Sequence, residues 1–439
     1  MADNNNILII APEIPPRANS WGGSQRMYYL ADMLEKQGRN VITISPGFQT
    51  APECVNKEVL YEPVYLGGDA GGGDEEGNGQ KCSEGEKEKK RKKWIFLPGK
   101  IKRTIYMFMA AADYFLYGEP SSFQGIFYKK WLKNYEETIL GCILHKGIKK
   151  VIISGPSFAL FSVAGKIKKK DGSIKIIFDY RDPWFLWKKK KNLAYLKEKK
   201  YLKNADCIVC FSEAFRKDMC RTFKIESSKT AMVYNGYSDD EWKKAERRAG
   251  KKKRDGNRLL VTYVGSMDFN DNKKNYRNPN IVIRAAEKCE KGIVELRFVG
   301  VAAVEKMEKR NNVSYIGRVT QEESLLYMLE SDVLLSIHDT DDDSGKYLVP
   351  GKFYDYMRSG RVVWNIGKED GLAAEFLNEY ELGVSCANRA DSVEGMLRRL
   401  IGLKQKGGIE KLRRTGGKEV FRFSREVQNR EYIKVLESL

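Results

Sequence analysis

Arg181 and Asp182 are the first residues whose types and position suggest chemistry. They follow the apolar run IKIIFDY, which predicts a buried strand. In a parallel sheet, the carboxyl ends of the strands form the edge where ligands bind. A carboxylate at that edge can orient an acceptor hydroxyl or take its proton, and a guanidinium can hold it in place. The alternative is a buried Asp and Arg pair that only fixes the loop.

Gly22 and Gly23 come just before an expected helix at residues 25–38 (QRMYYLADMLEKQG). Without side chains, they let a ligand approach backbone N–H groups at the positive end of a helix, where an anion binds favourably. A tight turn is the alternative role. His338 follows the apolar run VLLSI later in the chain, and we expect it to line a ligand-binding edge.

The elements that must position these residues alternate between strands and helices. ILIIAP from Ile7, the helix at residues 25–38 and VITIS form a βαβ unit. This pattern is typical of a doubly wound parallel sheet. The loop after the first strand lacks GxGxxG, and the second strand ends ISPGF without an acidic residue to hold a ribose. A nicotinamide-dependent enzyme is therefore excluded.

A second series of strands and helices follows residues 239–257, which are almost wholly charged and are expected to form a linker. Thr320 and Glu323 have the capping-box spacing that starts a helix. The expected strands are LLVTYVG, VELRFVG, NVSYIG, DVLLSI and VVWNI, and the expected helices cover residues 279–290, 321–330 and 352–359.

These series predict an α/β fold with two Rossmann-like domains that face one another across a cleft. We expect the N-terminal domain at residues 1–238, the C-terminal domain at 258–424 and a final helix at 425–439. Residues 67–93 contain eight glycines and runs of Glu and Lys. Such a segment buries too little apolar surface to fold, so we expect a disordered insertion.

Composition narrows the class of protein. The 439 residues include 78 Lys and Arg against 59 Asp and Glu, a net charge of +19, and 42% are hydrophobic. This composition excludes a disordered or collagen-like chain.

The longest apolar window, Thr104–Tyr117, is too short to span a membrane and contains Asp113. No signal-peptide pattern precedes Ile7, so we expect a cytoplasmic protein. Eight dispersed cysteines and two histidines give no zinc pattern, so no metal site is expected.

Five motifs in order along the chain resemble glycosyltransferase family 4, which has the GT-B fold, and especially its capsule and O-antigen branch. They are the PP…GG loop before the first helix, Asp179–Trp184, Tyr234–Gly236, Tyr263–Ser266 and Ser331–Gly360. The resemblance implies retaining transfer from a nucleotide-diphosphate sugar, with the donor on the C-terminal domain and the acceptor on the N-terminal one. It also implies that no metal is used, since fixed cations and N–H donors stabilise the leaving diphosphate. The run Asp341–Asp343 is then a solvated loop.

The resemblance also implies a cation site for the diphosphate. The family has a Gly-Arg pair followed by a Lys, whereas here Ser266 follows Gly265. The nearest candidates are Lys273, Lys274 and Arg277, and Lys274 is the preferred catalytic cation.

A helix in the C-terminal half is expected to bind the rest of the donor. By resemblance, Lys352 contacts the donor, and Gly351 lies beside it in a first turn whose N–H groups face the ligand. Asp355 aligns with a Glu that binds the ribose, but is one methylene shorter. The preceding Glu of the family pattern is replaced by Tyr347. Stabilising the helix end is the alternative role of Asp355.

Two basic runs adjoin aromatic residues in the N-terminal half, Lys87–Leu97 and Trp184–Lys191. Such runs suit an anionic membrane surface, and predict a peripheral enzyme at the inner face of the cell membrane with a glycan or lipid-linked acceptor. No nucleic-acid-binding motif is present, so nucleic acid is not expected as a partner. Two alternatives stay open, a sugar-nucleotide epimerase of GT-B fold and a non-catalytic basic protein that binds membrane or nucleic acid.

Overall fold

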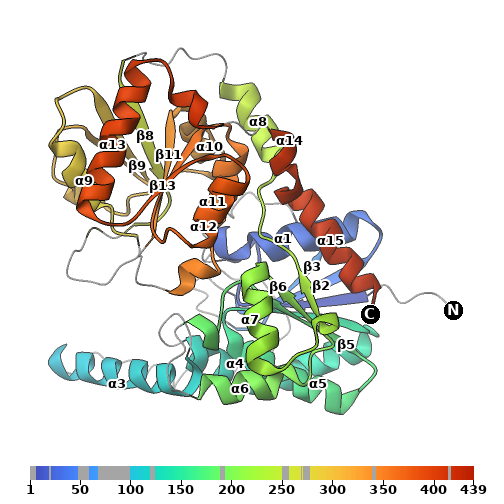
Figure 1. The fold of residues 1–439 in the computed structure, drawn as a ribbon. Helices are drawn as coiled ribbons and strands as arrows, with labels where there is room; N and C mark the ends of the chain where they lie inside the picture. The colour runs from blue at the N-terminus through green and yellow to red at the C-terminus, as the bar shows by residue number, and fades with distance from the viewer. Residues whose placement is uncertain are drawn as a thin grey trace. The chain divides into compact units, whose positions relative to one another are not determined.

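The chain divides into two compact units, Met1–Val209 and Cys210–Leu439, each taken by itself below (Figure 1). The computed structural model describes residues 6–18, 21–47, 59–67, 99–118, 124–187, 193–249, 257–267, 269, 277–338, 343–413 and 417–439. Apart from Gly67, the expected insertion lies outside these residues, as do Lys273 and Lys274.

The first sheet is a parallel sheet with strand order β3-β2-β1-β4-β5-β6-β7 among the described residues. Its central strands are runs of Ile and Val buried on both faces, as expected for a sheet covered by helices on both sides. The strands are β1 (Asn6–Ile10), β2 (Asn40–Ser45), β3 (Glu62–Tyr65), β4 (Lys150–Gly155), β5 (Lys175–Tyr180), β6 (Cys207–Cys210) and β7 (Thr230–Met232). The α-helices are α1 (Trp21–Lys36), α3 (Gly99–Tyr117), α4 (Gln124–His145), α5 (Ala164–Lys170), α6 (Ala194–Leu202) and α7 (Glu213–Phe223).

The second sheet is also parallel, with strand order β10-β9-β8-β11-β12-β13 among the described residues. Its strands are β8 (Leu259–Val264), β9 (Val294–Val299), β10 (Val313–Ile316), β11 (Val333–Ile337), β12 (Val362–Ile366) and β13 (Gly383–Cys386). The α-helices of the second unit after α7 are α8 (Asp239–Ala249), α9 (Asn280–Glu287), α10 (Gln321–Glu330), α11 (Gly351–Arg358), α12 (Leu372–Glu379), α13 (Ala390–Gln405), α14 (Gly417–Val420) and α15 (Arg425–Glu437).

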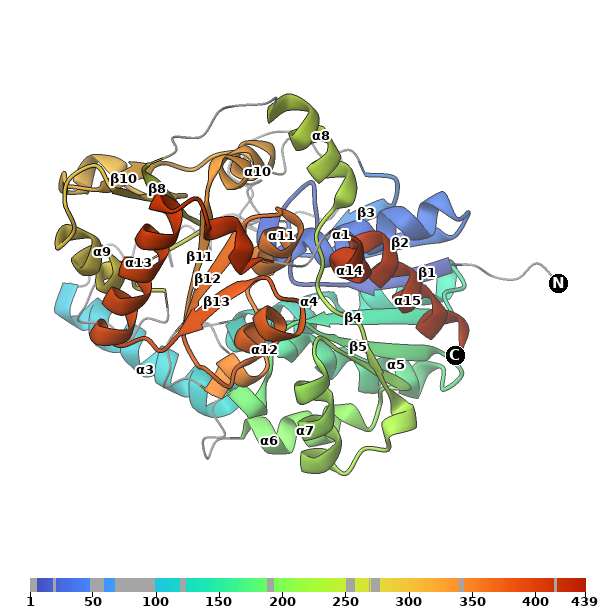
Figure 2. The ribbon, with the colours of Figure 1, turned by 45° about the horizontal axis from the view of Figure 1, so that its top comes forward.

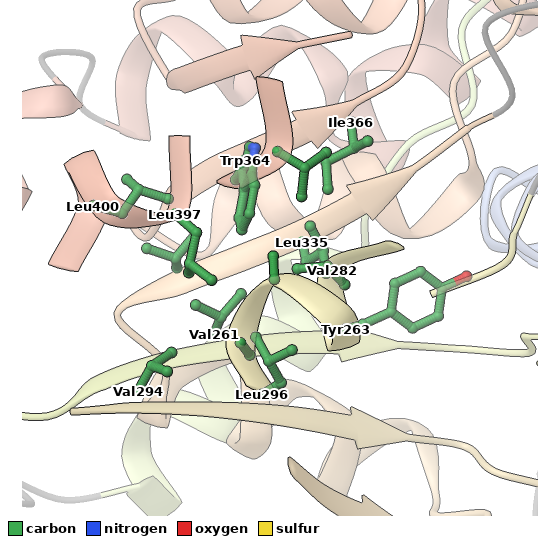
Figure 3. Close-up of a cluster of buried hydrophobic side chains, with 14 of the residues drawn as sticks. Val261, Tyr263, Val282, Val294, Leu296, Leu335, Trp364, Ile366, Leu397 and Leu400 are labelled. Carbon is green, nitrogen blue, oxygen red and sulfur yellow. The ribbon is translucent and has the colours of Figure 1, made fainter. Parts of the chain in front are cut away.

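The core of the second unit has two layers because side chains alternate across each strand. Val333 and Leu335 pack with α9 and α13 on one face, whereas Leu334 packs with α10, α11 and α12 on the other. Figure 3 shows the first layer, in which Leu397 and Leu400 of α13 cover the strands. Both faces are thereby buried, and the carboxyl ends of the strands are where a sheet of this kind binds ligands.

Several expectations about local structure are confirmed. Two doubly wound parallel sheets are present, and the helix at residues 321–330 begins with the predicted capping box between Thr320 and Glu323. Helix α1, however, begins at Trp21, so Gly22 and Gly23 lie inside its first turn and not before it. The charged residues 239–249 form α8, because Trp242 and Ala245 are buried one turn apart. The expected domain limits stay a prediction.

Asp332 provides a test of the second core. Its Oδ1 accepts from Lys404 Nζ at 2.9 Å and its Oδ2 accepts from the Leu260 N–H at 3.0 Å, and both charged side chains are buried. Asp332→Ala removes both bonds and leaves a buried charge, so the free energy of unfolding of this unit should fall by about 3–5 kcal/mol. Denaturant unfolding followed by circular dichroism measures this loss. Glu431→Ala, in an exposed pair with Lys434, should change it by less than about 1 kcal/mol, and equal losses would contradict the assignment.

Candidate functional site

The carboxyl edge of the second sheet contains a point where the chain turns in opposite directions. From β8 the chain continues to β9 and β10 on one side, and from β11 to β12 and β13 on the other. The loops after β8 and β11 therefore diverge, and such a point is where open α/β sheets bind ligands. Gly265 and Ser266 follow β8, and His338 follows β11. Helix α11 connects the carboxyl end of β11 to the start of β12, so its first turn lies at the same edge.

Lys352 projects from that turn onto the end of β8. Its Nζ lies 3.1 Å from the centre of the Tyr263 ring, where the negative face of the ring attracts a cation. Gly265 has a φ of +120°, and a Cβ there would lie only 3.4 Å from Nζ, so a glycine suits both the backbone and the contact. Among the described residues, no carboxylate pairs with Lys352.

Arg277 adds a second cation to this edge. Its Nη1 donates to Ser266 Oγ at 2.8 Å. Burial, followed by the charge of Arg277, holds the pKa of Lys352 well below its usual range. Burial, followed by the charges of Lys352 and Arg277, lowers the pKa of His338 to about 3, so that imidazole is neutral at neutral pH. An anion bound beside Arg277 and Lys352 would favour the charged form of Lys352.

Asp355 lies one turn beyond Lys352 and has a different environment. Its Oδ1 accepts from the Trp242 indole N–H at 3.0 Å, so the carboxyl group contacts α8. Burial raises its pKa to about 7, although Arg425 acts in the opposite direction. The structure thus brings Gly265, Ser266, Gly351 and Lys352 to one edge, and places the Asp355 side chain against a neighbouring helix.

Arg181 is at the equivalent edge of the first unit, directly after β5. Its guanidinium donates to three backbone carbonyls, those of Gly155 at the end of β4, Pro156 after it, and Gly23 in α1. These bonds hold together the loops at the point where the first sheet changes direction, between β1 and β4. The geometry matches the loop-fixing alternative for Arg181. Asp182 follows it at the same edge and is half-buried.

A buried polar group in the first unit escaped the sequence reasoning. Arg26 of α1 donates to Asp179 Oδ1 at 3.0 Å, and Ser154 donates to Asp179 Oδ2 at 2.8 Å. All three side chains are buried. A signal was present, because Arg26 lies four residues before Leu30 and therefore shares the buried face of its helix. Tyr263 was likewise seen only as part of a motif.

The expected membrane-facing run beginning at Trp184 needs a correction. Trp184 is 2% exposed, stacks on Phe158 with ring centres 5.2 Å apart and donates its indole N–H to the Tyr117 carbonyl. A buried ring of this kind cannot contact a membrane. The basic parts of both runs, Lys188–Lys191 and Lys87–Lys93, lie outside the described residues.

Metal-binding clusters, cysteines and membrane-spanning helices complete the description of the described residues. Within the described ranges, no group of three or more His, Cys, Asp or Glu side chains is arranged to hold a metal ion; Asp341 and Asp342 fall outside those ranges. Cys207 and Cys210 are free and buried in β6. None of the described helices is both long and apolar enough to cross a bilayer.

Comparisons with known proteins agree with this architecture. Residues 144–241 match the model of Glycosyltransferase Family 4. A glycosyltransferase from Rickettsia africae ESF-5 is 12% identical, with 99% of this chain and 98% of that chain covered and a TM-score of 0.58. Anabaena HepE in complex with UDP and glucose is 11% identical, with 99% and 100% covered and a TM-score of 0.60. The catalytic domain of starch synthase IV from Arabidopsis thaliana, bound to ADP and acarbose, is 11% identical, with 98% of each chain covered and a TM-score of 0.57.

No curated protein sequence matches the chain significantly. At 11–12% identity the solved structures show the fold, and the two parallel-sheet domains confirm the expected GT-B architecture.

Asp355 gives a prediction about pH. Its pKa is raised from 3.8 to about 7, so the folded state binds this proton more tightly than the unfolded state, and the carboxyl group costs stability as pH rises through that window. Asp355→Asn keeps an oxygen for the Trp242 N–H but does not titrate. Its stability relative to the parent should rise by about 2–4 kcal/mol between about pH 4 and pH 7 and then level off. Denaturant midpoints across this range measure the difference. A constant difference would contradict the burial of an ionisable group here, and Glu431→Gln at an exposed site should follow the parent.

Proposed function

We propose that this chain, a family 4-like glycosyltransferase of GT-B fold, transfers a sugar from a nucleoside-diphosphate sugar to a glycan or lipid-linked acceptor in surface polysaccharide synthesis. The observation that carries the proposal is the Lys352 ammonium group at the carboxyl edge of the second sheet, where it has no carboxylate partner among the described residues. HepE is solved with UDP and starch synthase IV with ADP, which supports a nucleoside diphosphate as the ligand.

The donor diphosphate binds Lys352 and Arg277 in this proposal. The N–H groups in the first turn of α11, beginning at Gly351, and the Ser266 hydroxyl provide donors beside these cations. Lys273 and Lys274 remain proposed further cations, with Lys274 the preferred catalytic one. Asp355 is proposed to bind the ribose, which requires the carboxyl group to exchange its bond with Trp242 for a ribose hydroxyl.

The transfer retains the configuration of the anomeric carbon. The bond from the sugar to the diphosphate breaks through an oxocarbenium-like state, and the acceptor oxygen attacks from the same face. A departing phosphate oxygen takes the acceptor proton, so neither a covalent nucleophile nor a metal is required. Fixed cations stabilise the charge on the leaving group.

The acceptor is assigned to the first unit. Asp182 orients the acceptor hydroxyl, and Arg181 acts as a positioning residue because its guanidinium binds backbone carbonyls. Gly22 and Gly23, in the first turn of α1, are proposed to approach the donor. A net charge of +19 supports peripheral association with an anionic membrane at the inner face of the cell membrane.

Lys352→Met tests the donor site. An anion beside Lys352 favours its charged form and opposes the lowering of its pKa, so binding of a nucleoside diphosphate should be accompanied by proton uptake. The variant should lose this uptake and bind about 10- to 100-fold more weakly. Calorimetry in buffers of different ionisation enthalpy measures both quantities. Lys411→Met removes an exposed charge in the segment Ile409–Leu412 and is the matched control. Unchanged affinity in Lys352→Met would remove the proposed site.

The reaction itself is tested with a panel of nucleotide sugars. One donor should release nucleoside diphosphate in the presence of an acceptor, and this release should survive EDTA because the proposed site uses protein cations. NMR of the product should show the donor's anomeric configuration. Release that EDTA abolishes and Mg²⁺ or Mn²⁺ restores would contradict the cation site, and an inverted product would contradict the mechanism. An isomerised nucleotide sugar without release would indicate an epimerase, and no turnover a non-catalytic protein.

A further inference from the structure

Helix α3 of the first unit presents an apolar face to its surroundings. Phe108 is 74% exposed and Phe115, two turns later, is 55% exposed, and Met107 and Leu116 next to them are exposed as well. Ala111 and Ala112 lie between these residues on the same face and are also exposed. The outward side of residues 104–116 therefore carries no charge. Surface helices of globular proteins normally turn their apolar residues toward the core and their charged residues toward solvent.

The inward side of α3 contains its polar anchor. Asp113 is the charged residue within Thr104–Tyr117, and it is buried. Its Oδ1 accepts from the Ile126 N–H at 2.6 Å in the first turn of α4, where a carboxylate stabilises the start of a helix. At the end of α3, the Phe115 carbonyl accepts from the Leu193 N–H. The helix is thus held in one orientation by its polar groups, with the apolar residues outward.

Two neighbouring helices extend this surface. Phe127 of α4 comes one residue after Ile126, whose N–H is bonded to Asp113. Leu196 of α6 comes three residues after Leu193, whose N–H is bonded to the Phe115 carbonyl. Both Phe127 and Leu196 are exposed. Exposed lysines come next on the same faces of these helices, Lys130 three residues after Phe127, and Lys199 and Lys200 three and four residues after Leu196. We call Met107, Phe108, Phe115, Leu116, Phe127 and Leu196 the α3 face.

We propose that the α3 face docks into the headgroup boundary of an anionic lipid bilayer. Apolar residues with lysines beside them match the two layers of such a surface, acyl chains below and negative headgroups above. Helix α3 is about 28 Å long and extends past the other helices of the first unit in both views (Figures 1 and 2), so it can lie flat on a membrane. The inference rests on the proposed function, because a lipid-linked acceptor gives an enzyme reason to bind there.

The test uses the full chain with Phe108→Glu and Phe115→Glu combined. Both side chains point outward, so the variant should fold like the parent. Sedimentation with phosphatidylcholine vesicles, with and without phosphatidylglycerol, measures binding. The parent should bind the anionic vesicles and the double variant at least about tenfold more weakly. The matched control is Leu60→Glu, an exposed apolar residue of the same unit outside the α3 face, which should bind like the parent.

A second variant examines the lysines. Lys130→Gln, Lys199→Gln and Lys200→Gln combined should reduce binding to anionic vesicles and its sensitivity to salt, because exposed charges are screened within about 10 Å at 0.1 M. Equal vesicle binding by parent and double variant would overturn the proposal. So would a parent that ignores vesicles but forms dimers that Phe108→Glu and Phe115→Glu dissociate, because the face would then bind a second copy.

Donor binding is measured separately by calorimetry with a free nucleoside diphosphate. The double variant should bind the nucleotide like the parent, since no residue of the α3 face is among the proposed donor residues. Vesicle binding without any transfer activity would contradict the proposed function and leave the docking surface standing. Transfer without vesicle binding would contradict the docking surface and leave the proposed function standing.

Discussion

The Lys352 ammonium group lies over the Tyr263 ring because the parallel sheet brings the end of β8 and the start of α11 to one edge. Burial and the nearby Arg277 disfavour its charge, while the ring gives only partial compensation. Cores on both faces of the sheet fix β8 and α11, so this cation cannot easily move away from its position. The second unit therefore contains an amine held in one position, and an anion beside it would favour its charged form.

Arginines of the first unit are used differently. The Arg181 guanidinium donates to three backbone carbonyls, and Arg26 pairs with the buried Asp179. Their hydrogen bonds join the ends of strands to the first helix, so these cations stabilise the structure of the sheet edge. This difference between the units supports the proposal that the anionic donor binds the second unit and a hydroxyl acceptor binds the first.

In helix α3 a buried polar group again fixes the local structure, and here it decides which side chains are exposed. Asp113 is buried because it binds the start of α4, and that bond turns the aromatic residues outward. Exposed Phe and Met side chains on a helix held in this way are a feature of a surface that binds something apolar. The adjacent lysines give that surface its positive charge.

The sequence by itself determined the fold class. Short buried strands alternating with helices require two doubly wound parallel sheets, and Thr320 with Glu323 fixes the start of α10 through local hydrogen bonds. The resemblance to glycosyltransferase family 4 singled out Gly265, Ser266 and Lys352 as candidate donor residues, and the structure brings them to one edge of the second sheet. Contacts between residues far apart in the chain were decided only by the tertiary structure. The Asp355 carboxyl group meets an indole from α8, Trp184 packs on Phe158, and α3 turns its apolar face outward. Local pattern does not encode such contacts, since a side chain's environment depends on which distant element packs against it.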